Sequence, residues 1–229
     1  MKINIAKKIS EELEQQQIEK YWLDTLKKYK NPFLGLLSGF QKKDSAFFML
    51  ISCIVNDVLR DITIGYDTEI QTLNLKARRL FENLLLLHWI NRHSPREVYI
   101  QFAKEQILFC QDIKKYQHLT PAAILVLDEQ IKLATNGARQ LGIIGIEKEK
   151  CKRINFKNEA EKANLKEEYF LLYNISSTLI HGGIFSSKFR HEQPSDLMYK
   201  NMIFSLLSKI LPLLETEIKK IKLKKDTYK

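Results

Sequence analysis

Glycine and proline are scarce in this chain: 8 glycines and 5 prolines occur among 229 residues. These two residues supply most tight turns, so their scarcity argues against a fold of short strands joined by turns. Apolar side chains instead recur every three to five positions over long segments, a spacing that places them on one face of an α-helix. Apolar residues make up 45% of the chain, enough for a sizeable core. The sequence therefore predicts an all-α bundle.

Capping residues and helix breakers predict where the helices begin and end. Ser94-Pro95-Arg96-Glu97 has the pattern of a capping box, and Gly182-Gly183 that of a C-terminal stop. The dipeptide Asn31-Pro32 is expected to end the first helix, and the charged, aperiodic stretch 147–158 is expected to be an exposed loop. About seven helices are predicted, over residues 3–29, 44 or 45 to 64, 67 or 68 to 91, 94–117, 120–141, 164–181 and 194–223, with a short apolar turn over 33–40.

No linker, internal repeat or low-complexity segment divides these helices. One helical domain over residues 1–229 is therefore predicted. A long amphipathic first helix cannot bury its own apolar stripe, so it should pack on the body or on a second copy of the chain. The predicted parts are an N-terminal helical extension (1–43), a core (44–183), a C-terminal helix (194–223) and a basic tail (219–229).

The charge and cysteine content narrow the class of protein. Lysine and arginine number 37 against 27 acidic residues, a formal net charge of +10, which suits a polyanionic partner and equally suits a lysine-rich, soluble chain. Of three cysteines, Cys53 and Cys110 stand among apolar residues and are expected to be buried, which argues against disulfides or a zinc site. Without a bilayer-length apolar segment or a signal peptide, the chain is expected to be cytoplasmic.

The first candidate site segment is Ala77-Arg78-Arg79-Leu80-Phe81-Glu82-Asn83. Arg78 and Glu82 are four positions apart, as are Arg79 and Asn83, so each pair shares a helix face. Two interpretations of the Arg78–Glu82 pair stay open. It is either an ordinary surface ion pair or a buried, mutually satisfied pair of the kind that marks a site.

The second candidate segment is the helix that ends at His181. Asn174 and His181 are seven positions apart, two helical turns, and project in nearly the same direction, with Tyr173 and Ser177 on the adjacent flank. A histidine there can act as a general acid or base near neutral pH. The alternative is that His181 caps the last carbonyl groups of its helix.

Together, the run from Ala77 to Glu82 and the later pattern of Tyr169, Tyr173, Ser176-Ser177 and His181-Gly182-Gly183 resemble DUF5677, a family of uncharacterised helical bacterial proteins. The resemblance covers residues 64–183. That family in turn resembles the HEPN superfamily of helical bundles, many of which are metal-independent ribonucleases of toxin–antitoxin and antiphage systems. The resemblance implies a HEPN-like core over residues 44–183 and a homodimer that uses no cofactor or metal.

The resemblance also implies roles for individual residues. His181 would transfer protons while the RNA 2′-OH attacks the adjacent phosphate. Asn174 stands where the superfamily has its signature arginine, so Arg78 or Arg79 would supply the positive charge, with Glu82 orienting it. The residues expected to line the RNA site are Tyr173, Asn174, Ser177, Lys188 and Arg190.

The leading prediction is therefore an RNA-binding protein or metal-independent endoribonuclease, acting as a toxin or antiphage effector with an unidentified antitoxin or defence-system partner. The alternative is a non-catalytic interaction module in which Arg78, Glu82, Tyr173 and Ser177 form a structural network. Binding to a membrane surface through the tail 219–229 is disfavoured, because the tail lacks a Trp or Phe face.

Overall fold

The structure is a computed structural model. The structure describes residues 2–41, 45–63, 69–116, 118–149, 153–180 and 196–223. These ranges contain eight α-helices and one short 3-10 helix but no strand, which confirms the predicted all-α fold. The elements are α1 (Lys2–Gln41), α2 (Ala46–Ile62), α3 (Ile70–Asn91), α4 (Pro95–Lys114), α5 (Pro121–Gln140), η1 (Ile146–Lys148), α6 (Phe156–Lys162), α7 (Lys166–Ile180) and α9 (Asp196–Leu223).

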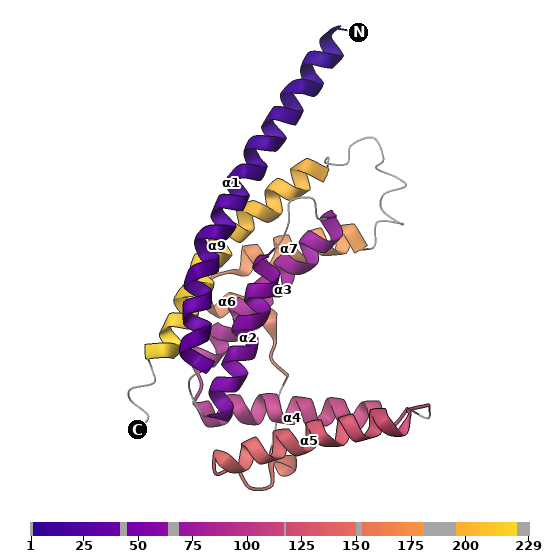
Figure 1. The fold of residues 1–229 in the computed structure, drawn as a ribbon, viewed down its shortest axis with the longest axis vertical. Helices are drawn as coiled ribbons and strands as arrows, with labels where there is room; N and C mark the ends of the chain where they lie inside the picture. Colours follow the sequence, from indigo (N-terminus) through magenta and orange to yellow (C-terminus); the bar gives the residue numbers. More distant parts are fainter. Residues whose placement is uncertain are drawn as a thin grey trace.

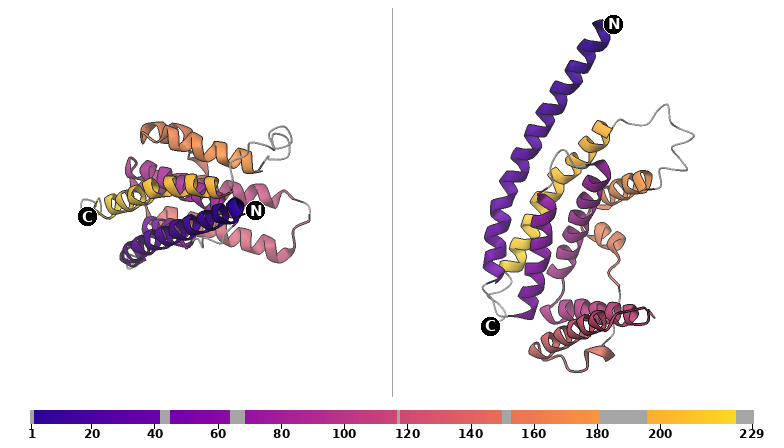
Figure 2. Two further views of the ribbon diagram at one scale, coloured as in Figure 1. Left: turned by 90° about the horizontal axis from the view of Figure 1, so that it is seen from above. Right: turned by 45° about the vertical axis from the view of Figure 1, so that its right-hand side comes forward.

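The helix α3 lies at the centre of the main bundle and contacts α2, α6, α7 and α9. The helix α1 packs against α2 and α9, and its N-terminal part reaches beyond the other helices (Figure 1). The helices α4 and α5 form an antiparallel hairpin that crosses the opposite end of the bundle (Figure 2). The largest fully buried side chains include Phe33, Phe40, Ile51, Phe81 and Phe204, which come from four of these helices.

The prediction that Asn31-Pro32 ends the first helix is wrong, because α1 continues through Pro32 to Gln41. A proline inside a helix removes one hydrogen bond and costs about 3 kcal/mol. Burial of one large apolar side chain contributes about 1.5–3 kcal/mol. The segment predicted as a turn buries four such side chains when it is helical: Phe33, Leu36, Leu37 and Phe40. Their burial outweighs the local cost of the proline.

The prediction of an exposed loop over residues 147–158 is wrong at its C-terminal end, where α6 begins at Phe156. The Asn155 side chain caps this helix by accepting a hydrogen bond from the backbone N–H of Asn158, at 3.2 Å. Ala160 and Glu159 are buried, so tertiary contacts stabilise a helix that is too short to form alone. This helix raises the number of α-helices from the predicted seven to eight within the described ranges.

The hairpin of α4 and α5 has its own small core, separate from that of the main bundle. The predicted capping box is confirmed: Ser94 Oγ accepts from the Glu97 N–H, and Glu97 accepts from the Ser94 N–H. The two helices approach closely at Gly137, where a Cβ would overlap the Tyr99 hydroxyl and stand 2.8 Å from its Cζ. The Tyr99 hydroxyl donates to the carbonyl of Ala134 at 3.1 Å, and burial raises the pKa of Tyr99.

The two cysteines within the described ranges behave differently. Cys110 is buried, as predicted, but the prediction that Cys53 is buried is wrong. Ile51 and Ile54 turn toward the core on either side of Cys53, whereas Cys53 shares the outer face of α2 with the exposed Met49. None of the helices in the described part of the chain has the length and apolar character needed to cross a membrane.

Candidate functional site

The candidate site is centred on Arg78, in the middle of α3. Arg78 Nε donates a hydrogen bond to Glu82 Oε1 at 2.9 Å, one turn further along the same helix. The Tyr173 hydroxyl of α7 donates to the same carboxylate oxygen at 2.7 Å. Because Glu82 accepts from both helices, this carboxylate joins α3 to α7. We refer to Arg78, Glu82 and Tyr173 as the α3–α7 network.

The Arg78 guanidinium also lies over the Tyr173 ring, with its central carbon 4.2 Å from the ring centroid. This is the geometry of a cation–π contact. Tyr169, one turn earlier on α7, stacks on Tyr173 with the ring centroids 4.2 Å apart and the planes 24° apart. The guanidinium plane is therefore held on one side by an aromatic ring and at Nε by a carboxylate.

The sequence left open whether Arg78 and Glu82 form an exposed or a buried ion pair, and the structure shows an intermediate case. The side chains of Arg78 and Glu82 are 33% and 27% exposed, so the pair is neither fully buried nor freely solvated. Within the part of the chain that the structure describes, the two Nη groups of Arg78 donate no hydrogen bond. Arg78 is thus fixed at Nε while its outer nitrogens remain available to a ligand with oxygen acceptors.

The electrostatics of the network keep Tyr173 protonated. Burial raises the pKa of Tyr173, and its hydrogen bond to the Glu82 carboxylate raises it further. Partial burial would lower the pKa of Arg78, but the hydrogen bond to Glu82 and the charges around it raise the pKa overall. At neutral pH the phenol is a fixed donor and the guanidinium a fixed cation, so this pair can position and bind but has no proton to transfer.

Arg79, the neighbouring residue, has a different partner. Its Nε donates to Asp61 Oδ2 at 2.8 Å, and its Nη2 donates to Asp61 Oδ1, which makes the pair bidentate. Asp61 belongs to α2 and its side chain is 1% exposed, whereas the Arg79 side chain is 39% exposed. The hydrogen bond to Asp61 raises the pKa of Arg79. The sequence analysis paired Arg79 with Asn83 on one helix face and did not predict its contact with Asp61.

Five of the candidate residues lie wholly or in part outside the described residues. His181, Lys188 and Arg190 lie outside the described residues, and so do the side chains of Asn174 and Ser177, whose backbones belong to α7. Of the predicted site residues, the structure therefore brings together Arg78, Glu82 and Tyr173, and directs Arg79 elsewhere.

A further polar cluster joins α3 to α9 around Glu217. Asn91 Nδ2 donates to Glu217 Oε2 at 2.6 Å, Lys220 Nζ to Oε1 at 2.7 Å, and His88 Nδ1 lies 3.6 Å from Oε1. Burial alone would raise the pKa of Glu217, but the hydrogen bonds from Lys220 and Asn91 lower it overall. No sequence pattern linked Glu217 to α3, because Asn91 lies on a different helix 126 residues away. The described partners of this carboxylate come from both α3 and α9, so it stabilises the contact between the two helices.

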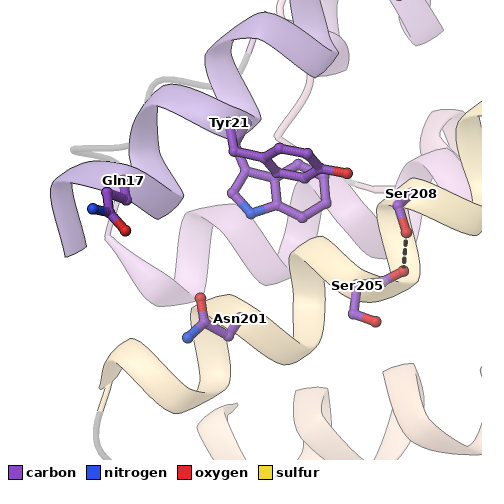
Figure 3. A pocket seen from close by; sticks show the side chains of 6 residues that line it. Gln17, Tyr21, Asn201, Ser205 and Ser208 are labelled. Atoms are coloured by element: carbon purple, nitrogen blue, oxygen red, sulfur yellow. Dashed lines mark hydrogen bonds between the residues drawn. The ribbon is translucent and has the colours of Figure 1, made fainter. Parts of the chain in front are cut away.

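A shallow cavity of about 440 Å³ lies between α1 and α9 (Figure 3). Figure 3 shows the Gln17 and Asn201 carboxamides and the Tyr21 ring facing it, beside the hydrogen bond from the Ser208 hydroxyl to the Ser205 carbonyl. Among the described residues, its lining has no charged side chain that would bind a phosphate or transfer a proton. Among the described side chains, no group of three or more His, Cys, Asp and Glu residues could hold a metal ion.

These features define an all-α protein with a cross-helix Arg–Glu–Tyr network. The model of DUF5677, a family of unknown function, matches residues 65–198, which is more than half of the chain. The protein therefore belongs to the DUF5677 family, as the sequence motifs predicted. The match includes the whole α3–α7 network as well as His181, Lys188 and Arg190. Neither the curated proteins nor the solved structures contain a match to this chain.

Proposed function

We propose that the protein is a HEPN-like RNA-binding protein and metal-independent endoribonuclease. The observation that carries the proposal is the state of Arg78: Glu82 fixes its Nε and Tyr173 supports its plane, while both Nη groups donate no hydrogen bond within the described part of the chain. A guanidinium held in this way loses little conformational freedom when it binds a phosphate. The formal net charge of +10 would attract the RNA backbone.

In this proposal Arg78 binds a phosphate that flanks the scissile one. Its guanidinium contacts Tyr173, and His181 follows Tyr173 by eight positions. At about 1.5 Å per residue, α7 rises by about 10 Å from Tyr173 to Ile180, the residue that precedes His181. Arg78 and His181 of one chain therefore address different phosphates, whereas a homodimer could bring His181 of one copy to Arg78 of the other. Glu82 and Tyr173 are positioning residues for Arg78.

The proposed reaction is an internal transesterification of RNA. The 2′-OH loses its proton to His181, and its oxygen bonds to the adjacent phosphorus. The bond from phosphorus to the 5′ oxygen breaks, and that oxygen takes up a proton. The products are a 2′,3′-cyclic phosphate and a 5′-hydroxyl end. Asn174, Ser177, Lys188 and Arg190 are proposed to contact the RNA backbone around this step.

The test is RNA cleavage by purified wild type, His181→Ala, Arg78→Ala and Arg96→Ala. Arg96 is the matched control, since its side chain is 57% exposed and lies in α4, outside the α3–α7 network. We expect His181→Ala to reduce kcat to background, and Arg78→Ala to raise KM about tenfold, the effect of losing one charge-assisted hydrogen bond. Arg96→Ala should cleave as wild type does. Background cleavage of every RNA by wild type and His181→Ala alike would rule out the nuclease.

A second candidate function is a non-catalytic interaction module. The observation that favours it is that the α3–α7 network already joins two helices without a ligand. In that case wild type would neither bind nor cleave RNA, and Tyr173→Phe would lower stability with no effect on any RNA measurement. RNA binding that is lost in Arg78→Ala, in a variant that still folds, would exclude this candidate.

A further inference from the structure

A second cavity lies directly beside the α3–α7 network and shares Glu82 with it. This cavity has a volume of about 240 Å³ and lies between α2, α3 and α6. Its polar lining comes from Asp57, Arg60 and Asp61 of α2 and from Arg79, Glu82 and Asn83 of α3. The Phe156 side chain, at the start of α6, adds an aromatic surface. We refer to this space as the α2–α3 cavity.

The charges that line the α2–α3 cavity argue against a phosphate as its ligand. Three carboxylates, those of Asp57, Asp61 and Glu82, stand against the two guanidinium groups of Arg60 and Arg79. An anion would find no excess of positive charge there, and it would approach carboxylates that repel it. The chemistry of the lining instead suits a ligand that carries no net charge and has hydrogen-bond donors as well as acceptors.

Only part of this lining is used by internal contacts. Asp61 is fully engaged by Arg79, and Arg60 Nη2 lies 3.1 Å from Asp57 Oδ1. Within the described part of the chain, the Asn83 carboxamide has no hydrogen-bond partner, and neither do Glu82 Oε2 and Asp57 Oδ2. Arg60 also keeps N–H groups that no described acceptor binds, and its side chain is 62% exposed. The cavity thus presents free carboxylate oxygens, a carboxamide and a guanidinium.

The size of the cavity limits the ligand to a small group. Pockets that hold drug-sized molecules begin at about 300 Å³. A cavity of about 240 Å³ therefore suits a single planar ring system. Unstacked RNA bases bind in this way, with their faces on aromatic rings or guanidinium planes and their edges hydrogen-bonded to polar side chains. Phe156 and the two arginines offer such surfaces.

We propose that the α2–α3 cavity binds a guanine base of single-stranded RNA. Guanine carries two adjacent acceptors, O6 and N7, which a guanidinium such as that of Arg60 can contact together. Its opposite edge carries two adjacent donors, N1–H and the 2-amino group, which suit the free carboxylate oxygens of Glu82 and Asp57. No other RNA base has both an adjacent pair of acceptors and an adjacent pair of donors. The proposal rests on the RNA-binding function proposed above and specifies the base that the site selects.

The location of the cavity connects base binding with phosphate binding. Glu82 holds Arg78 through Oε1 and lines the cavity, where its Oε2 is free within the described residues. One carboxylate can therefore accept from guanine while it still positions Arg78. A base in the cavity would place its own backbone next to Arg78, so guanine would determine which phosphate Arg78 binds.

The experiment measures binding of fluorescent oligouridine strands that contain one guanosine, one inosine or one adenosine. Inosine lacks only the 2-amino group, so it isolates the hydrogen bond that this group donates to a carboxylate. For wild type we expect the guanosine strand to bind about tenfold more tightly than the inosine strand, the factor that one charge-assisted hydrogen bond provides. Adenosine, which has an amino donor in place of the O6 acceptor and an acceptor in place of the N1–H donor, should bind more weakly still. Equal affinity for the three strands would overturn the guanine proposal while the RNA-binding function stands.

Arg60→Gln is the matching variant, and Arg96→Gln is its control, since both arginines are exposed and the substitutions remove the same charge. Arg60→Gln should lose the preference for guanosine over adenosine, whereas Arg96→Gln should keep it. An unchanged preference in Arg60→Gln would overturn the assigned role of Arg60. Titration of wild type with free guanosine and free inosine, followed by NMR, separates the two proposals. If no strand binds but free guanosine binds selectively, the guanine site in the cavity is supported and the RNA-binding function is excluded. If neither the strands nor free guanosine bind, both proposals are excluded.

Discussion

The two sides of α3 use adjacent arginines in opposite ways. On the side of α2, Arg79 gives Nε and Nη2 to a carboxylate that is 1% exposed. On the side of α7, Arg78 gives Nε to a carboxylate that is 27% exposed, and its Nη groups donate no hydrogen bond to a described residue. An arginine that neutralises a buried charge cannot leave it without a large cost. The difference indicates that Arg79 stabilises the fold, whereas Arg78 is available to a ligand.

The largest expected effect is that of Arg79→Met. It would leave the Asp61 carboxylate buried without its guanidinium, and we expect the free energy of unfolding to fall by about 3 kcal/mol. Urea denaturation measures this loss, and Arg96→Met, in an exposed pair on α4, should change it little. Adding Asp61→Asn to Arg79→Met should restore part of the stability, because the buried charge is then removed. A double variant less stable than Arg79→Met would contradict this account.

The next effect concerns the other side of α3. Tyr173→Phe removes the hydrogen bond that the phenol donates to the Glu82 carboxylate and leaves the ring in place. A hydrogen bond to a charged group contributes about 1.5 kcal/mol, so the free energy of unfolding should fall by that amount. Tyr116→Phe is the control, because Tyr116 is 72% exposed. Equal stability of Tyr173→Phe and wild type would show that the hydrogen bond from Tyr173 to Glu82 contributes nothing to the fold.

The stability difference between wild type and Tyr173→Phe should depend on pH. Burial and Glu82 raise the folded-state pKa of Tyr173 above its ordinary value of 10.0. A group with a raised folded-state pKa contributes stability that is complete below the unfolded-state pKa and is lost as the pH rises through the folded-state value. The stability difference between wild type and Tyr173→Phe should therefore be constant up to about pH 9 and shrink above pH 10. Denaturation curves from pH 7 to 11 measure it, and a difference that grows above pH 10 would reverse the assigned sign.

The smallest expected effect on stability is that of Arg78→Met. The Arg78–Glu82 pair is partly exposed, and such a pair together with a cation–π contact contributes about 1 kcal/mol or less. The variant should nevertheless bind RNA about tenfold more weakly, the effect of losing one charge-assisted hydrogen bond. Denaturation and RNA-binding measurements on Arg78→Met and Arg79→Met then test the comparison directly. If Arg78→Met loses as much stability as Arg79→Met, the two arginines do not have different roles.

Local features of the sequence predicted the parts of this fold that depend on local interactions. The capping box at Ser94 formed as expected, because both of its hydrogen bonds join residues three positions apart. The predicted end of the first helix at Pro32 was wrong, because the side chains that keep α1 helical beyond this residue are buried against other helices. The helix α6 was missed for the same reason: its short, charged sequence is stabilised by tertiary contacts, since Ala160 is buried and the buried Glu159 pairs with Arg92, 67 residues earlier.

For the candidate site, the sequence by itself determined the family, the helical framework and the Arg78–Glu82 pair, because residues four apart on a helix are neighbours whatever the rest of the chain does. The same rule paired Arg79 with Asn83, but Arg79 binds Asp61, 18 residues earlier on α2. That choice depends on which helices meet, and so does the arrival of Tyr173 from α7, 91 residues after Glu82. Only the tertiary structure decided which of two adjacent arginines neutralises a buried charge, and which one has outer nitrogens that donate no hydrogen bond to a described residue.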